Sequence, residues 1–299
     1  MFLDVYKSIR DRRIEAKKRR KEDKRYSTIN ETFKLSLNGA IGNFIQKYSW
    51  LYDPLANMKV TVNNQLLILK WIEMLYLAGF KTISANTDGI TVYVKKSRKD
   101  KYYEVCKKWC ELTKYTLEFA EYEKLVMFAV NDYVAVKKTD SIKFEDKYKF
   151  KGATFLQEAR MGKGMKLPLI VPKALFQHFV LNNDYKTYIN EYKDIKHFTR
   201  FEKTGKQFKV KWGENFTQRI NRFYVSDSGD YLKKINDNDP DKIKTISILK
   251  DTKVMLLNKF EEDKSFEDYN VNLTYYIEQC DEIINQFKVF DLNTLKNVI

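Results

Sequence analysis

Two runs of β-favouring residues flank a Thr-Asp-Gly tripeptide, and this arrangement constrains the fold more than any other feature of the sequence. The runs cover residues 81–86 and 90–96, and residues 87–89 separate them. An Asp-Gly pair between such runs is a strong local signal for a β-hairpin. An amphipathic helix over 99–121 and further strand-rich runs over 125–152 follow. Strand pairs with a helix between them predict an α+β fold with an antiparallel sheet.

The N-terminal region predicts two helices joined by a short polar turn. Nine of the fifteen residues at 11–25 are Lys or Arg, and the absence of Gly and Pro from this run favours a helix. The following run predicts a second helix capped by Thr28 or Asn30. Its expected apolar positions are Phe33, Leu35, Leu37 and Ile41. The two helices would form a basic hairpin.

Residues 51–64 predict a connection with some extended structure, because they contain Pro54 and the run KVTVN. Residues 65–78 predict a buried helix that ends at Gly79. Residues 153–171 are loop-like, and helical patterns dominate beyond them. A domain boundary is therefore expected within this loop-like stretch.

Charge indicates the class of partner. The 299 residues contain 55 Lys and Arg against 40 Asp and Glu, which gives a net charge of +15. This excess predicts a polyanionic partner, although an AT-rich genome would also encode many lysines. A hydrophobic content of 43% excludes a disordered chain. The sequence contains no apolar run long enough to span a membrane and no secretory signal, so we expect a cytoplasmic protein with no membrane contact.

Three polar residues are the first candidates for chemistry. Asp88 at a hairpin tip is well placed to hold a divalent metal ion, although Asp-Gly also serves as turn chemistry alone, with Gly supplying positive φ. Lys34 and Asn38 are four residues apart and share one helix face. A Lys suits phosphate and an Asn can bond a phosphate or sugar oxygen, but a solvated surface pair has the same spacing.

The order of these motifs resembles family B DNA polymerases, specifically the bacteriophage branch. The family's fingers motif is Lys, three residues, then Asn-Ser-x-Tyr-Gly. This chain matches it at Lys34, Asn38 and Gly42, with Gly39 in place of Ser and Ile41 in place of Tyr. The resemblance extends over roughly residues 5–290.

Two later motifs carry the same resemblance. The family's palm motif is Asp-Thr-Asp-Ser, and residues 86–89 read Asn-Thr-Asp-Gly. A family Lys-x-Tyr strand that contacts the primer, followed by Lys-Gly, is matched by Tyr133 and by Lys151-Gly152. Asn131 stands where the lysine of that strand motif is expected.

The resemblance implies part of a right-hand polymerase architecture. Residues 1–48 would be fingers helices, 49–152 the later part of the palm with an antiparallel sheet, and 153–299 a mostly helical thumb. Asp88 would ligate Mg²⁺ in a two-metal site, and Lys34 would neutralise the charge of a deoxynucleoside triphosphate. The other implied nucleotide-binding residues are Asn38, Gly42, Arg10, Arg13 and Lys17.

The resemblance also implies contacts with primer–template DNA. The implied DNA-binding residues are Thr87, Tyr133, Lys151, Gly152, Lys209 and Lys211. The palm motif Asp-x-x-Ser-Leu-Tyr-Pro, which carries the second metal-binding Asp in the family, does not occur. We therefore expect an upstream polymerase chain to supply that Asp and the exonuclease, in the cytoplasm of an infected bacterial host. The alternatives are a non-catalytic DNA-binding remnant or accessory module and an unrelated basic RNA-binding protein.

Overall fold

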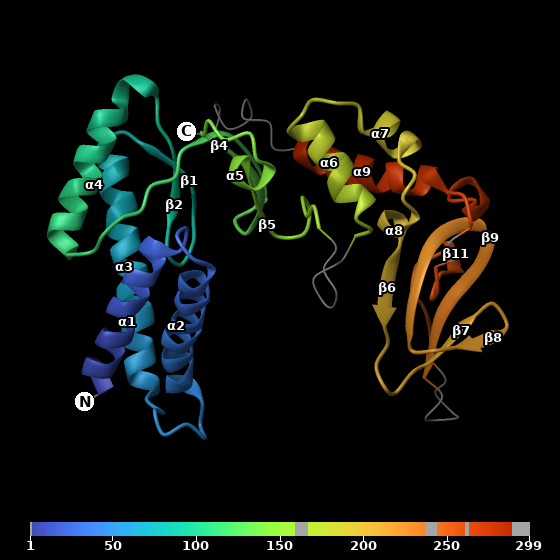
Figure 1. Cartoon of the computed structure of the whole chain (residues 1–299), viewed down its shortest axis with the longest axis horizontal. Helices are drawn as coiled ribbons and strands as arrows, with labels where there is room; N and C mark the ends of the chain where they lie inside the picture. The colour runs from blue at the N-terminus through green and yellow to red at the C-terminus, as the bar shows by residue number, and fades with distance from the viewer. Residues whose placement is uncertain (1, 159–166, 237–243, 261–262, 289–299) are drawn as a thin grey trace. The chain divides into compact units, whose positions relative to one another are not determined.

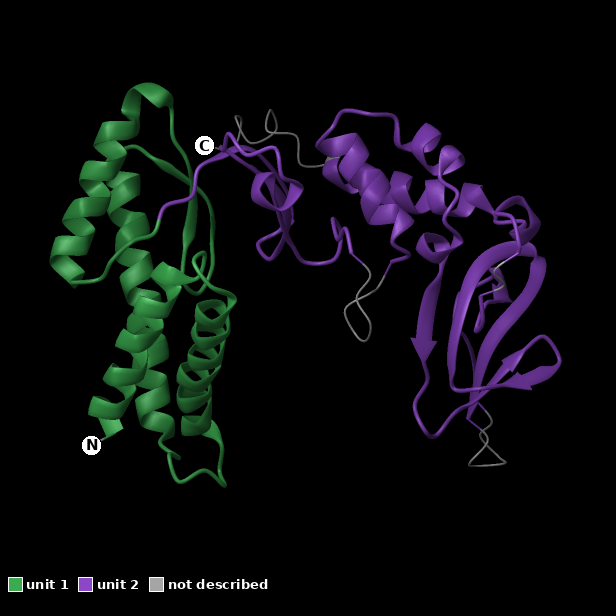
Figure 2. Ribbon diagram, in the orientation of Figure 1, with its two compact units in different colours: residues 1–118 green, residues 119–299 purple. Residues whose placement is uncertain are grey.

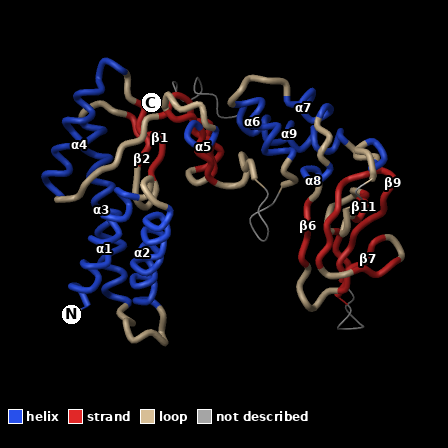
Figure 3. Tube along the Cα trace, viewed as in Figure 1, coloured by secondary structure: helices blue, strands red, loops and turns tan. Residues whose placement is uncertain are grey.

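The computed structural model describes residues 2–158, 167–236, 244–260 and 263–288 (Figure 1). The chain divides into two compact units, residues 1–118 and 119–299 (Figure 2). Both units mix helices with antiparallel strands, as Figure 3 shows, so the predicted α+β class is confirmed. The division falls within the stretch 49–152 that the resemblance assigns to one domain.

Unit 1 begins with the predicted helical hairpin, formed by α1 (Phe2–Arg19) and α2 (Lys24–Gly42). The predicted cap is wrong: Asp23 caps α2, and its carboxylate accepts a hydrogen bond of 2.8 Å from a backbone N–H of the first turn. The Thr28 hydroxyl instead donates to a carbonyl inside the helix, and Asn30 lies a full turn beyond the start. Local capping by Asp thus fixes where the basic hairpin turns.

Helix α3 (Pro54–Leu77) replaces the extended connection predicted for residues 51–64. Asp53 caps it by accepting a hydrogen bond of 2.9 Å from the N–H of Ala56. Pro54 occupies the first turn, where its missing N–H removes no intrahelical bond. Gly79, at φ +78°, follows the C-terminus in the predicted left-handed position. The predicted extended connection is wrong because a helix with a capped start accommodates both a proline in its first turn and the β-branched residues that follow.

The predicted hairpin is confirmed as β1 (Lys81–Ala85) paired with β2 (Ile90–Tyr93). Helix α4 (Lys99–Thr113) follows and ends eight residues before the predicted limit, because Lys114 adopts φ +62°. Between α3, α4 and the hairpin lies a core whose buried members are Trp71, Leu75, Phe80, Val105, Cys106 and Trp109. This core fixes the hairpin relative to the two helices.

Unit 2 contains two separate sheets. The first has the order β3 (Tyr122–Ala129), β4 (Asp132–Lys137), β5 (Tyr148–Lys151), with the short helix α5 (Phe144–Lys147) before β5. One face of this sheet packs into the main core through Val126, Val134, Tyr148 and Phe150. The β1–β2 hairpin belongs to a different sheet, so the single palm layer expected from the sequence does not form as one hydrogen-bonded sheet among the described residues.

The mostly helical region predicted for 153–299 is wrong, because the described residues 200–236 and 244–256 contribute six strands to an antiparallel sheet. Its strands are β6 (Arg200–Lys203), β7 (Lys209–Trp212), β8 (Asn215–Thr217), β9 (Ile220–Asn236), β10 (Lys244–Ser247) and β11 (Lys253–Leu256). The long strand β9 pairs with β6, β7, β10 and β11. At Gly229 a Cβ atom would lie 2.2 Å from the carbonyl oxygen of Val254, so this close strand approach requires glycine.

Four helices complete the described part of unit 2. They are α6 (Ile170–Phe179), α7 (Tyr185–Glu191), α8 (Ile195–Phe198) and α9 (Leu273–Lys288). The fully buried Tyr276 of α9 ties helix to sheet: its hydroxyl accepts from the N–H of Val225 at 3.0 Å and donates to the carbonyl of Phe198 at 2.8 Å. Among the described helices, none has the length and apolar content needed to cross a bilayer.

Candidate nucleotide and nucleic-acid site

Asp88 lies at the tip of the β1–β2 hairpin with its side chain exposed to solvent. The N–H of Asn86 donates to the carbonyl of Gly89 at 2.9 Å, and the Asn86 amide oxygen accepts from the N–H of Asp88 at 3.1 Å. Asn86 therefore holds the turn, and Gly89 does not adopt the positive φ that the turn-only interpretation assigned to it. Thr87 is also exposed at this tip, and the two hydrogen bonds that close the turn use neither the Thr87 hydroxyl nor the Asp88 carboxylate.

A carboxylate oxygen is the kind of ligand that Mg²⁺ prefers, and Asp88 offers one. Across the described ranges, no group of three or more His, Cys, Asp or Glu side chains is close enough together to hold a metal ion. One exposed carboxylate does not make a two-metal centre. The described residues therefore fit part of such a site and not the whole of it.

Lys34, Asn38 and Gly42 recur every four residues on α2 and so share one helix face. All three are exposed, whereas Leu37 on another face of the helix is buried. Cβ atoms added at Gly39 or Gly42 would meet nothing within 4 Å, so protein packing does not require glycine at either position. A glycine inside a helix lowers stability by roughly 0.5–1 kcal/mol relative to Ala. Because packing within the protein does not explain these two glycines, we interpret them as positions where an external group can approach the helix backbone closely.

Arg10, Arg13 and Lys17 form a stripe on α1, with spacings of three and four residues. Lys17 is ion-paired with Glu118, and this hydrogen bond lowers the pKa of the Glu118 carboxyl, with smaller effects from Arg20 and Arg13. Arg10 pairs with Asp11 at 2.7 Å. The field along α1 therefore already stabilises one carboxylate anion.

Unit 1 carries most of the net positive charge. Residues 1–118 contain 24 Lys and Arg against 13 Asp and Glu, a net +11 of the total +15. No hydrogen bond or ion pair between described residues joins Asp88 to Lys34 or Asn38. Asp88, Lys34 and Asn38 therefore lie in the same positively charged unit but do not bond to one another.

Tyr133 and Lys151 are directly opposite each other on β4 and β5, so the structure brings these two predicted residues together. Gly152 follows with φ +82°, and a Cβ there would lie 2.4 Å from the Asp132 carboxyl group. That carboxylate accepts from the N–H and the hydroxyl of Thr154 at 3.1 and 2.8 Å. Gly152 is thus a structural requirement that sets the position of Lys151.

Lys209 and Lys211 lie on β7 of the other sheet in unit 2. Lys211 is ion-paired with Glu214 at 2.5 Å and stands directly opposite Lys233 of β9. Like charges in directly opposed positions destabilise a strand pair, and a polyanion bound across them would relieve the repulsion. Lys233 was not identified from the sequence, since only the strand register reveals it.

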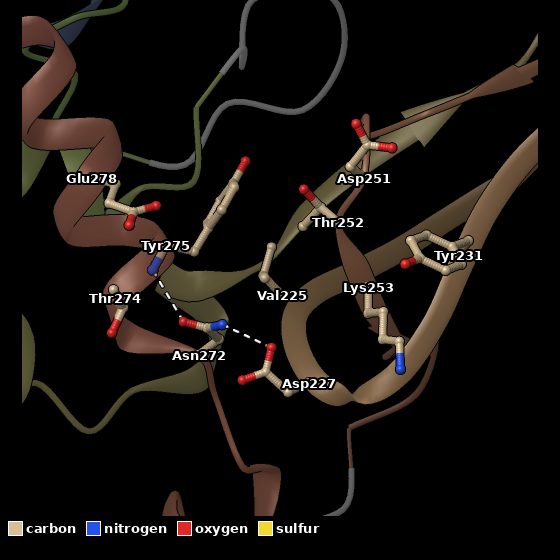
Figure 4. Close-up of a pocket in the computed structure, with 10 residues that line it drawn as sticks. All are labelled: Val225, Asp227, Tyr231, Asp251, Thr252, Lys253, Asn272, Thr274, Tyr275 and Glu278. Carbon is tan, nitrogen blue, oxygen red and sulfur yellow. Dashed lines mark hydrogen bonds between the residues drawn. The ribbon is translucent and has the colours of Figure 1, made fainter.

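Sequence reasoning also missed a polar cavity of about 360 Å³ between β9, β11 and the start of α9 (Figure 4). Asn272 bridges it by donating to Asp227 at 2.9 Å and accepting from the N–H of Tyr275 at 3.1 Å. Its charged lining residues are Asp227, Asp251, Glu278 and Lys253. This acidic lining repels phosphate, so we assign the cavity no part in nucleic-acid binding.

The fold and these sites define a basic, two-unit α+β protein with an exposed carboxylate, Asp88, at the tip of the β1–β2 hairpin. No protein-family model matches the chain, and no curated protein matches it either.

Proposed function

We propose that this chain is the C-terminal part of a template-directed DNA polymerase that adds deoxynucleotides to a primer 3′ end. The observation that carries the proposal is the order of the motifs together with the elements that bear them. Lys34, Asn38 and Gly42 lie along one exposed helix face, Asp88 is at a hairpin tip, and Tyr133 faces Lys151 across paired strands.

The chemistry assigned to these groups is electrostatic. Lys34 and the basic stripe of α1 would balance the charge of the triphosphate, and Asn38 would orient the nucleotide by hydrogen bonding. Bound divalent ions would supply Lewis-acid stabilisation of the reacting phosphate, with Asp88 as one of their ligands. Because Asp88 is one carboxylate, the active enzyme requires a second Asp from an upstream polypeptide.

The outer face of α3 supports the requirement for a second polypeptide. One face of this helix packs into the core, yet the opposite face is also apolar and is exposed. Its members, each at least 44% exposed, are Leu55, Met58, Val62, Leu66, Leu69 and Tyr76. An exposed apolar face on a helix calls for a cover, and these side chains, which flank the exposed Lys70–Glu73 ion pair, expose on the order of 600 Å², close to what one partner contributes to a standard interface.

The location of this face favours the upstream polymerase chain as its occupant. Helix α3 leads directly into β1, and the N–H of Phe80 donates to the carbonyl of Leu75 at 2.9 Å across that junction. A chain seated along α3 would therefore contact the same rigid body that carries Asp88. A second copy of this chain is the competing occupant, and it would bring no new carboxylate motif.

The test is primer extension with Mg²⁺ and all four deoxynucleoside triphosphates, with and without the polypeptide encoded immediately upstream. We expect extension only with both chains, and its loss in Asp88→Ala. Asp140→Ala is the matched control, because Asp140 is an exposed loop carboxylate of unit 2. Absence of extension by the two chains, or full activity of Asp88→Ala, would refute the proposal.

The second candidate is a non-catalytic DNA-binding module, which the solitary position of Asp88 favours. Such a module would bind duplex DNA with a steep dependence on salt and no requirement for nucleotide. Salt-dependent binding without extension, in the presence of the upstream chain, would select this alternative.

A further inference from the structure

Lys149 of β5 lies at the centre of a cluster to which all three strands of the first sheet in unit 2 contribute. Its Nζ donates to the hydroxyl of Tyr122 on β3 at 3.2 Å. The same Nζ lies 5.8 Å from the ring centroid of Tyr122 and 6.0 Å from that of Tyr133 on β4. One ammonium group therefore contacts two aromatic rings and is anchored by one hydroxyl.

The register places this cluster on the face that carries the predicted primer contacts. Lys149 is opposite Ala135, and Lys151 is opposite Tyr133, so all four residues share one face of the sheet. Ala135 is fully buried, and its small side chain leaves room above it for the longer neighbours. Val134 points to the other face and into the core. None of Tyr133, Ala135, Lys149 and Lys151 belongs to the main core cluster, so the Lys149 face is the one turned away from that core.

Lys149 keeps its full positive charge for an external group. Partial burial acts to lower its pKa, but the hydrogen bond to Tyr122 and the nearby hydroxyl of Tyr133 outweigh burial and raise it. Among the ion pairs of the described residues, none involves Lys149, whereas Lys211 is neutralised by Glu214. Neutral tyrosines thus position the ammonium without cancelling its charge.

We infer that Lys149 is the phosphate-contacting residue beside Tyr133 and takes the place of the lysine absent at Asn131. The ligand is a phosphodiester of the primer strand, so this inference rests on the proposed function. Asn131 is neutral and lies in the turn between β3 and β4, where it supplies no charge. Lys149 reaches the Tyr133 ring from the neighbouring strand and supplies the missing positive charge.

The test measures binding of a fluorescent primer–template duplex to the full chain by anisotropy, over a series of salt concentrations and without nucleotide. Lys149→Ala should weaken binding about tenfold at low salt and reduce the slope of log K against log salt by about one phosphate contact. Lys149→Arg should bind within about threefold of the unaltered chain. Tyr122→Phe should weaken binding but leave the slope unchanged, because it removes the anchor and keeps the charge.

Lys147→Ala is the matched control. Lys147 is exposed on α5 and lies 5.6 Å from the ring of Tyr148, whose side chain packs on the opposite face of the sheet. We expect less than a twofold change in binding. Far-UV circular dichroism of each variant confirms that the fold is retained.

Unaltered affinity and slope in Lys149→Ala, an equal loss in Lys147→Ala, or no DNA binding by the unaltered chain would each overturn the inference. The extension assay with Asp88→Ala fails or succeeds independently of these measurements. A chain that binds DNA through Lys149 and never extends a primer would refute the polymerase proposal alone.

Discussion

Replacing Gly152 by Ala should destabilise unit 2 strongly, because two independent features of the position exclude a side chain. The backbone has φ +82°, where an L residue costs roughly 1–2 kcal/mol. A Cβ atom would also lie 2.4 Å from the Cγ and Oδ1 atoms of Asp132 and 2.7 Å from its Cα. Contacts below 3.0 Å force Asp132 or the strand end to move.

The size of the stability loss in Gly152→Ala depends on how far Asp132 must move. Its carboxylate accepts two hydrogen bonds from Thr154, which is only 7% exposed. Hydrogen bonds to a charged group contribute about 1.5–3 kcal/mol each, so losing one of them and adding the backbone strain gives a loss of about 2.5–5 kcal/mol. With a urea m-value of about 2 kcal/mol/M, the unfolding midpoint of unit 2 should fall by about 2 M.

Urea unfolding followed by circular dichroism measures this change, and Gly39→Ala is the control. Gly39 lies inside α2 with nothing within 4 Å of the added Cβ, so the same substitution should stabilise by about 0.5–1 kcal/mol. Gly152→Asn separates the two causes, because Asn tolerates left-handed backbone but still carries a Cβ. A Gly152→Ala midpoint within 0.3 M of the unaltered chain would refute the reasoning.

Three further predictions concern a buried hydroxyl, a histidine and the outer face of α3. Tyr276→Phe leaves two buried backbone groups without their hydroxyl partner and should lower the free energy of unfolding by about 2–4 kcal/mol; a change below 0.5 kcal/mol would contradict this. Burial, together with nearby Lys173, lowers the pKa of His197, so its stabilising contribution is present above the ordinary value of about 6.5 and is lost as pH falls through the folded-state value. Thermal melts of His197→Gln should therefore show a weaker decline between pH 7 and pH 5 than those of the unaltered chain. The double change Leu66→Lys and Leu69→Lys should leave stability within about 0.5 kcal/mol, because both side chains are exposed, and should weaken binding of the upstream polypeptide in sedimentation; the buried Leu75→Ala should lose about 2–5 kcal/mol.

The elements that were predicted correctly are those whose signals are local. The α1–α2 hairpin, the β1–β2 hairpin and the helix end at Gly79 each depend on residues within one or two turns of each other. The helix over 54–64 was missed because Asp53 capping outweighs the β-branched residues that follow. A cap and a prolyl residue in the first turn start a helix that weak propensities do not stop.

The six-stranded sheet could not be predicted in the same way, because its central strand changes partners along its length. Strand β9 pairs with β6 and β11 near its start and with β7 and β10 near its end. Its burial pattern therefore follows different neighbours in each half and shows no single alternation. Pairings between residues far apart in sequence decide such a strand, and they leave little local pattern to detect.

The same contrast between local signals and long-range pairing applies to the residues of the candidate site. Motif spacing alone placed Lys34 and Asn38 on one helix face and Asp88 at a hairpin tip. Lys149 was not predicted, because its contact with Tyr133 exists only in the register that sets Lys149 opposite Ala135. A shift of one residue would turn Lys149 to the core face.

Register bears on the two explanations of the charge of +15, a polyanionic partner and codon composition. Codon composition can raise the number of lysines, but it does not determine which lysines face each other. Lys211 and Lys233 are directly opposed, and Lys149 is held between tyrosines with no acidic partner among the described residues. Opposed lysines lower the stability of a strand pair relative to neutral residues, and the ion pair of Lys211 with Glu214 offsets part of this repulsion. A bound polyanion would offset the remaining repulsion at Lys233 and would pair with the exposed ammonium of Lys149, whereas codon bias gives no reason for either arrangement.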